Sequence, residues 1–96
     1  MNNFVKICEK YDGGYTETYL HLCVQDENLV IKGSSFNYNA RKETVLCEMP
    51  LPNTLTSVND VLQFIMDNHD WYSWATITWD SLRTNNQLLA FIEEYL

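Results

Sequence analysis

Residues 12–24 read DGGYTETYLHLCV, and this stretch decides the fold. Asp12-Gly13-Gly14 is typical of a hairpin turn, because glycine readily adopts the positive φ angles that such turns need. The residues after it alternate, so that a strand sends one set to each face: Tyr15, Glu17, Tyr19, His21 and Cys23, and Thr16, Thr18, Leu20, Leu22 and Val24. We therefore expect a strand directly after a tight turn.

Three further strand signals surround this stretch. Residues 4–11 precede the turn and are rich in valine, isoleucine and aromatic residues, which favour strands. Residues 29–38 follow the polar turn 25–28, and Gly33-Ser34-Ser35 within them predicts a bulge or bend. Residues 44–49 give the fourth strand. The first half of the chain therefore predicts an antiparallel meander.

The second half begins after residues 49–53, where two prolines favour an extended connection. Ser57 is a good N-cap for a helix. Its apolar residues recur at helical spacing: Val58, Val61, Leu62, Ile65 and Met66. Residues 74–79 suit a short fifth strand. A second helix is expected from Thr84, with Gln87 at capping-box spacing.

The expected order of elements is β-β-β-β-α-β-α, in a single domain that spans residues 1–96. This order predicts an α+β fold with a four-to-five-stranded, mainly antiparallel sheet and two helices packed on one face. The other face of such a two-layer sheet stays partly open to water or to a partner.

Acidic residues are concentrated in the second half of the chain. The formal net charge is −7, and residues 53–96 hold six acids and one base against seven acids and five bases in residues 1–52. This charge repels nucleic acid phosphates and anionic membranes. We therefore expect neither direct nucleic acid binding nor membrane binding, and the acidity favours a basic protein as partner.

Three cysteines, Cys8, Cys23 and Cys47, lie in expected strands with apolar neighbours. Buried, reduced thiols in a cytoplasmic protein are the main interpretation, and a disulfide between two of them is the alternative. No signal peptide is visible at the N-terminus, and the apolar stretches are too short to span a bilayer.

Two groups of residues could in principle carry chemistry. Asp67-Asn68-His69-Asp70 has metal-ligand residue types, but adjacent residues at a helix end point in different directions, which favours a polar helix terminus. His21 and Cys23 share a strand face at a spacing too long for a direct hydrogen bond, so a half-exposed strand histidine is favoured. We therefore expect no catalysis, no metal and no cofactor.

Aromatic residues give a better functional signal. Trp71, Tyr72, Trp74 and Trp79 lie within nine residues, and a short strand would send them to both faces. Either the core buries them or one set is exposed, as tryptophan and tyrosine are in many interface hot spots. The tyrosines of the meander pose the same question: Tyr11, Tyr15, Tyr19 and Tyr38.

The leading hypothesis is a non-catalytic inhibitor that presents an acidic, aromatic-rich surface to a basic partner, such as a nuclease or a nucleic-acid-binding complex. Such a surface imitates the charge of a nucleic acid. The candidate contact residues are Glu17, Asp67, Asp70, Trp71, Trp74 and Asp80. In physical type the chain resembles toxin-immunity proteins and phage proteins that block host defence, such as anti-CRISPRs.

Two other hypotheses remain open. An adaptor module could act through an uncovered sheet face or edge strand, by homodimerisation or by strand addition. A small enzyme could use His21, His69 or a cysteine, although no motif supplies the other groups that such chemistry needs.

Overall fold

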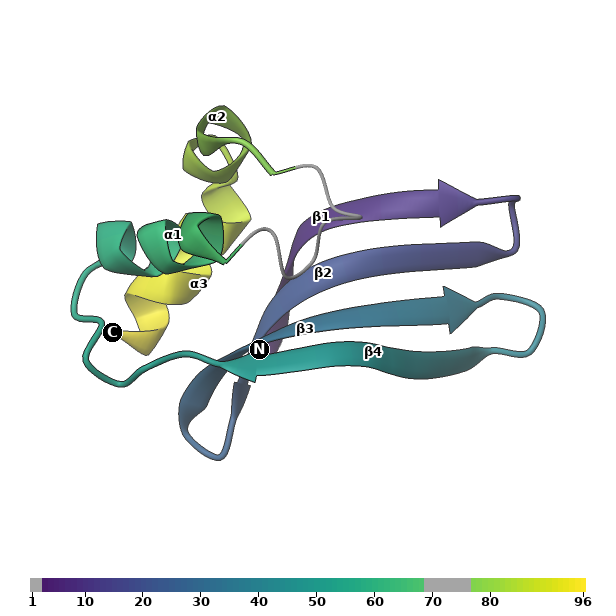
Figure 1. Cartoon of the computed structure of the whole chain (residues 1–96), viewed down its shortest axis with the longest axis horizontal. Helices are drawn as coiled ribbons and strands as arrows, with labels where there is room; N and C mark the ends of the chain where they lie inside the picture. The colour runs from purple at the N-terminus through teal and green to yellow at the C-terminus, as the bar shows by residue number, and fades with distance from the viewer. Residues whose placement is uncertain (1–2, 69–76) are drawn as a thin grey trace.

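A computed structural model describes residues 3–68 and 77–96 and shows an α+β fold, as expected (Figure 1). Four strands come first, followed by helices. The bounds are β1 Phe4–Asp12, β2 Thr16–Gln25, β3 Asn28–Asn37, β4 Lys42–Pro50, α1 Val58–Asp67, α2 Trp79–Arg83 and α3 Asn86–Tyr95.

The sheet is a simple antiparallel meander in the order β1-β2-β3-β4. Gly13 and Gly14 both have positive φ, at 65° and 81°, in the turn between β1 and β2, which confirms the expected hairpin. Asp26 and Glu27 also have positive φ, at 51° and 68°, so that β2 and β3 are joined by a two-residue loop with the twist that hairpins prefer.

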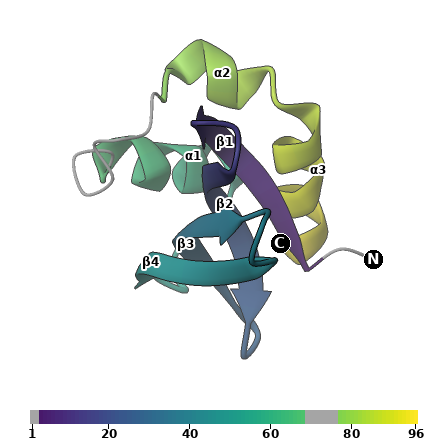
Figure 2. The same ribbon diagram turned by 90° about the vertical axis from the view of Figure 1, so that its right-hand side faces the viewer.

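The expected irregularity occurs at the predicted position, but its extra residue belongs to β4 and not to β3. The register between β3 and β4 shifts between Gly33 and Ser34, where Gly33 pairs with Cys47 and Ser34 with Val45, leaving Leu46 as the extra residue. A second shift occurs in β1 between Lys6 and Cys8. Bulges bend strands and increase their twist, and Figure 2 shows a strongly twisted sheet.

One face of β2 builds the core, as the alternation predicts. Leu20 and Leu22 are fully buried and belong to one cluster with residues of the helices. The cluster comprises Val5, Ile7, Leu20, Leu22, Leu29, Ile31, Leu51, Val61, Leu62, Ile65, Leu82, Leu88 and Ile92. The helices gather over one end of the sheet, and the β1–β2 and β3–β4 turns project away from them (Figure 1). We call the projecting part the free end of the sheet.

The first expected helix is confirmed at its N-terminus. The Oγ atom of Ser57 accepts a hydrogen bond from the Asp60 amide at 3.1 Å, and α1 begins at Val58. The second expected helix starts later than Thr84. Asn85 is the N-cap of α3, and its Oδ1 accepts from the Leu88 amide at 3.1 Å. Thr84 instead ends α2.

The expected fifth strand at residues 74–79 is wrong in its described part. Residues 74–76 lie outside the described residues, Ile77 and Thr78 belong to no strand, and Trp79 is the first residue of α2. Thr78 and Ser81 form a capping box, each side chain accepting from the other's amide at 3.1 Å. This local pairing starts a helix despite the strand propensity of the segment.

The side chains of α2 also pack on the core. Trp79 is half-buried against the core cluster, and the Arg83 guanidinium lies 4.7 Å from the centroid of its ring. Within residues 3–68 and 77–96, none of the helices has the length and apolarity needed to cross a membrane.

Candidate functional site on the open face of the sheet

The second face of β2 points away from the core and carries polar residues. Glu17, Tyr19, His21 and Cys23 alternate with the core residues of β2, and none of them belongs to the core cluster. We call this side of the sheet the open face. All four residues are nevertheless buried. In the described part of the chain, their cover comes largely from neighbouring strands.

Ring–ring and ammonium–ring contacts on the open face contribute to this cover. The ring of His21 lies 5.4 Å from that of Phe4 in an edge-on arrangement and 5.2 Å from that of Tyr19. The ammonium of Lys6 lies 5.3 Å from the centroid of the Tyr19 ring. Phe4 and Lys6 of β1 therefore cover part of the central residues of the open face.

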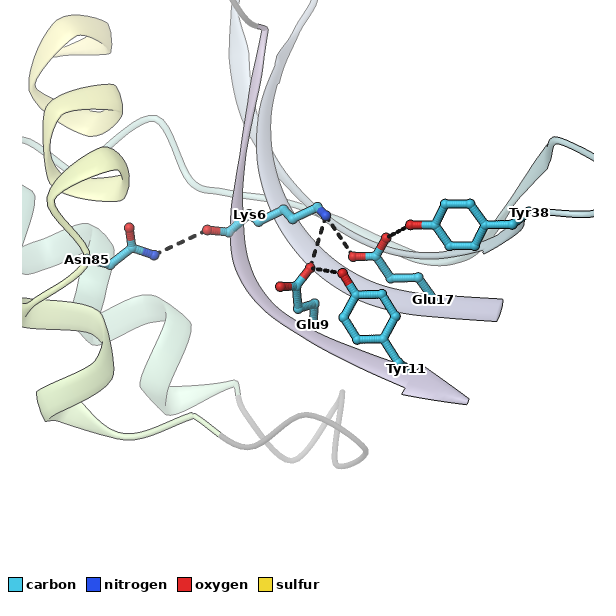
Figure 3. A network of polar contacts seen from close by, with 6 residues as sticks. All are labelled: Lys6, Glu9, Tyr11, Glu17, Tyr38 and Asn85. Carbon is cyan, nitrogen blue, oxygen red and sulfur yellow. Dashed lines mark hydrogen bonds and ion pairs between the residues drawn. The ribbon is translucent and has the colours of Figure 1, made fainter. Parts of the chain in front are cut away.

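An ion-paired network lies next to these rings, towards the free end (Figure 3). The Lys6 ammonium donates to Glu17 Oε2 at 2.7 Å and to Glu9 Oε2 at 3.0 Å. The Tyr38 hydroxyl donates to Glu17 Oε1 at 2.6 Å, and the Tyr11 hydroxyl donates to Glu9 Oε2 at 3.4 Å. We call these five residues the tyrosine–carboxylate cluster.

Glu17 is the central residue of this cluster. Its side chain is 4% exposed, whereas those of Lys6 and Glu9 are 43% and 41% exposed. The Glu9 carboxyl, the Lys6 ammonium and the Tyr38 hydroxyl hold the pKa of Glu17 well below its usual range, against the opposing effect of burial. The same contacts raise the pKa of Lys6, mainly through the hydrogen bond to Glu17. Glu17 is therefore ionised and held in place at neutral pH.

Three tyrosine rings surround the free end and remain accessible. Tyr11 and Tyr15 are each 61% exposed and Tyr38 is 47% exposed. Hydrogen bonds to Glu9 and Glu17 hold Tyr11 and Tyr38, and Tyr38 also makes an edge-on contact with Phe36 at 5.0 Å. Tyr15 is tied through its carbonyl, which accepts from the Tyr38 amide at 2.8 Å. The surface is therefore aromatic, acidic and ordered by its own contacts.

His21 differs from the sequence expectation of a half-exposed strand histidine, because it is 6% exposed. Its Nδ1 atom and the Oγ atom of Ser34 are buried and have no hydrogen-bond partner among the residues that the structure describes. Burial lowers the pKa of His21 against the opposing effect of Glu43, and Lys32, its register neighbour in β3, lowers it further. His21 is therefore neutral at physiological pH.

The three cysteines are free thiols. Burial raises the pKa of Cys23, and it raises that of Cys8 to about 11. An activated nucleophilic cysteine needs a shift in the opposite direction. Among residues 3–68 and 77–96, no three histidine, cysteine or acidic side chains are grouped so that they could hold a metal ion.

The structure separates the predicted contact residues. Glu17 lies in the cluster at the free end, whereas Asp67 is the last residue of α1 and Asp80 lies in the first turn of α2. Both of these aspartates are exposed, and Asp67 accepts from Gln63 Nε2 at 2.8 Å. Asp70, Trp71 and Trp74 lie outside the described residues, as do His69 and Tyr72.

Sequence reasoning missed Lys6 and Glu9 as members of the site. Only the pairing of β1 with β2, which sets Lys6 opposite His21 and Tyr11 opposite Glu17, brings them there. The signal in the sequence was weak: an acid at the centre of an aromatic strand face, which needs a cation or hydroxyl groups once it is buried.

Comparison with known proteins gives no relative from which a role could be taken. No family model matches the chain, and no match is found to a curated protein or to a solved structure.

Proposed function

We propose that this protein is a non-catalytic binding protein, which docks the free end of its open sheet face onto a basic surface of another protein. One observation carries the proposal: three exposed tyrosine rings, one of them hydrogen-bonded to the buried, ionised Glu17, lie at the part of the sheet that projects beyond the helices.

Tyrosine suits such a surface for physical reasons. Its ring contributes a large contact area with little side-chain entropy to lose, and its hydroxyl keeps a polar contact with water or with a partner. Tyr11 and Tyr38 are already oriented by Glu9 and Glu17, so binding costs less ordering of these side chains. Pre-organisation of this kind favours tight association.

The charge of the chain indicates the kind of partner. The formal net charge is −7, and the cluster itself contributes two carboxylates against one ammonium. Such a field accelerates association with a cationic surface and slows it with an acidic one. A protein that binds nucleic acid, such as a nuclease, presents a positively charged surface to it. Occupation of its binding groove would make this chain an inhibitor.

Capture from a lysate of the source cells tests the proposal, at low and at moderate salt. The wild-type protein is compared with the double variant Tyr11→Ala/Tyr15→Ala and with the control Leu96→Ala, which removes an exposed apolar residue at the other end of the chain. We expect one basic protein to be retained by the wild type and by the control, to be lost from the double variant, and to be released as salt rises.

Two results would contradict the proposal. One is that no protein is retained by the wild type more than by the double variant. The other is that the retained protein is acidic or that its capture does not respond to salt. Asp67, Asp70, Trp71, Trp74 and Asp80 stay predicted contact residues, and replacing Asp67 and Asp70 by lysine in the same assay tests two of them.

A further inference from the structure

The two edges of the sheet differ in how they are protected. The β1 edge has α3 beside it, and Asn85 Nδ2 donates to the Lys6 carbonyl at 3.2 Å. The β4 edge lies on the side of the sheet away from α2 and α3 (Figure 2). In the described ranges, β4 pairs with β3 alone, and seven of its nine residues are exposed.

The outer edge of β4 offers backbone groups for a further strand. The Leu51 amide donates to the Leu29 carbonyl at 2.9 Å, which sets the phase of the ladder. Along an antiparallel strand, the backbone groups of successive residues point alternately towards one neighbour and the other. The amides and carbonyls of Met49 and Cys47 therefore point towards β3, and those of Glu48 point outward. Pro50 also has an outward position, where its missing N–H costs no ladder bond.

Side chains on the open face of β4 form an acid–apolar–acid row. Glu43, Val45 and Glu48 lie opposite Phe36, Ser34 and Lys32 of β3. All three are exposed, and Val45 and the adjacent Leu46 are 48% and 55% exposed. An apolar centre between two carboxylates matches a strand with an apolar residue between two cations.

We propose that β4 receives an extended, basic segment of a partner protein as a fifth strand of the sheet. Main-chain hydrogen bonds to the outer edge of β4 supply affinity, and the open-face side chains select the segment. The segment carries a lysine or arginine beside Glu43, an apolar residue beside Val45, and a second lysine or arginine beside Glu48.

The bulge determines the spacing of these residues. Glu43 and Glu48 are five residues apart in β4, yet their partners in β3, Phe36 and Lys32, are four apart because the bulge absorbs Leu46. A regular strand paired with the outer edge of β4 would place its residues opposite Glu43 and Glu48 four positions apart, as β3 does. The pattern is therefore basic–x–apolar–x–basic, where x is any residue that tolerates the opposite face.

A second copy of this chain is a poorer occupant of the edge. Antiparallel pairing of β4 with itself about a two-fold axis at Val45 brings Glu43 of each copy opposite Glu48 of the other on the same face. Like charges across from one another are destabilising. The same acids that disfavour this pairing with a second copy attract a cationic strand, so they contribute to specificity as well as to affinity.

The probe for this site is a synthetic peptide, acetyl-TKTVTKT-amide, and its control replaces both lysines by glutamate. The amide resonances of the ¹⁵N-labelled full chain are followed during titration. We expect the lysine peptide to shift the resonances of residues 42–50 and to slow the exchange of the Glu48 amide with solvent. Binding of the glutamate peptide should be at least about tenfold weaker.

Charge reversal in the protein gives the matched comparison. Glu43→Lys/Glu48→Lys should weaken binding of the lysine peptide about tenfold, and it should reverse the preference towards the glutamate peptide. Glu93→Lys/Glu94→Lys changes the net charge equally on α3 and should leave the preference unchanged. Amide spectra of both variants establish that each remains folded.

Three outcomes would overturn the proposal: resonance shifts confined to other elements, equal binding of the two peptides, or a wild-type dimer in light scattering whose β4 amides are protected. The site is separate from the tyrosine–carboxylate cluster. Tyr11→Ala/Tyr15→Ala should bind the lysine peptide as the wild type does, so that failure of one proposal leaves the other intact.

Discussion

The covered end and the free end of the sheet use the same strands but stabilise them differently. At the covered end, Leu20, Leu22 and Ile31 are fully buried against the helices. At the free end, Glu17 is buried by Lys6 and Tyr38 rather than by a core. One strand, β2, contributes to both. Leu20 and Leu22 lie on the core face of β2, and Glu17 lies on its open face. The comparison shows that one alternating strand can supply a core on one face and an ordered polar surface on the other.

The largest expected effect tests the covered end. Leu22→Ala removes a fully buried side chain and leaves a cavity that the surrounding helices fill only in part. We expect the free energy of unfolding to fall by about 3 kcal/mol, measured by urea denaturation. The matched change at the free end, Tyr15→Ala, should alter it by at most about 0.5 kcal/mol. Equal losses at the two positions would show that the free end is part of the core.

A smaller effect is expected from the ion-paired network. Glu17→Gln removes the charged acceptor of both Lys6 and Tyr38, and we expect a loss of about 2 kcal/mol in the free energy of unfolding. Glu9→Gln is the control, because Glu9 contacts the same ammonium from an exposed position and should cost at most about 1 kcal/mol. A larger loss for Glu9 than for Glu17 would contradict the central role of Glu17.

The same network predicts how stability depends on pH. The pKa of Glu17 falls from an ordinary value of 4.5 to about 2 in the folded protein. Its contribution is therefore fully present above pH 4.5 and is lost as the pH falls towards 2. Urea denaturation of the wild type and Glu17→Gln along this range should give a difference that shrinks towards zero. A difference that stays constant with pH would show that Glu17 acts through packing alone.

Much of the fold could be predicted from local patterns. The Asp12-Gly13-Gly14 turn, the alternation of β2 and the Ser57 cap each depend on residues that are neighbours in sequence. The helix at Trp79 could not be predicted by strand propensity, because the capping box of Thr78 and Ser81 outweighs it. Local hydrogen bonds of this kind often decide between helix and strand in a short segment.

The candidate site was only partly visible in the sequence. Glu17 was predicted as a contact residue, and the structure places it inside a buried network from which tyrosines project. Its partners lie far away along the chain: Lys6 is 11 residues distant and Tyr38 is 21. Such pairs depend on strand register, and a shift of one residue would send every side chain to the opposite face.

The amino-acid sequence by itself determined the strands, the tight turns, the first helix and the excess of acids, because each of these depends on composition or on neighbouring residues. The tertiary structure alone decided which side chains meet. Hairpin register brings Lys6 to Glu17, the bulge brings Glu43 and Glu48 onto one face, and packing of α3 beside β1 leaves β4 as the accessible edge. These features arise from contacts between distant segments, which no local pattern encodes.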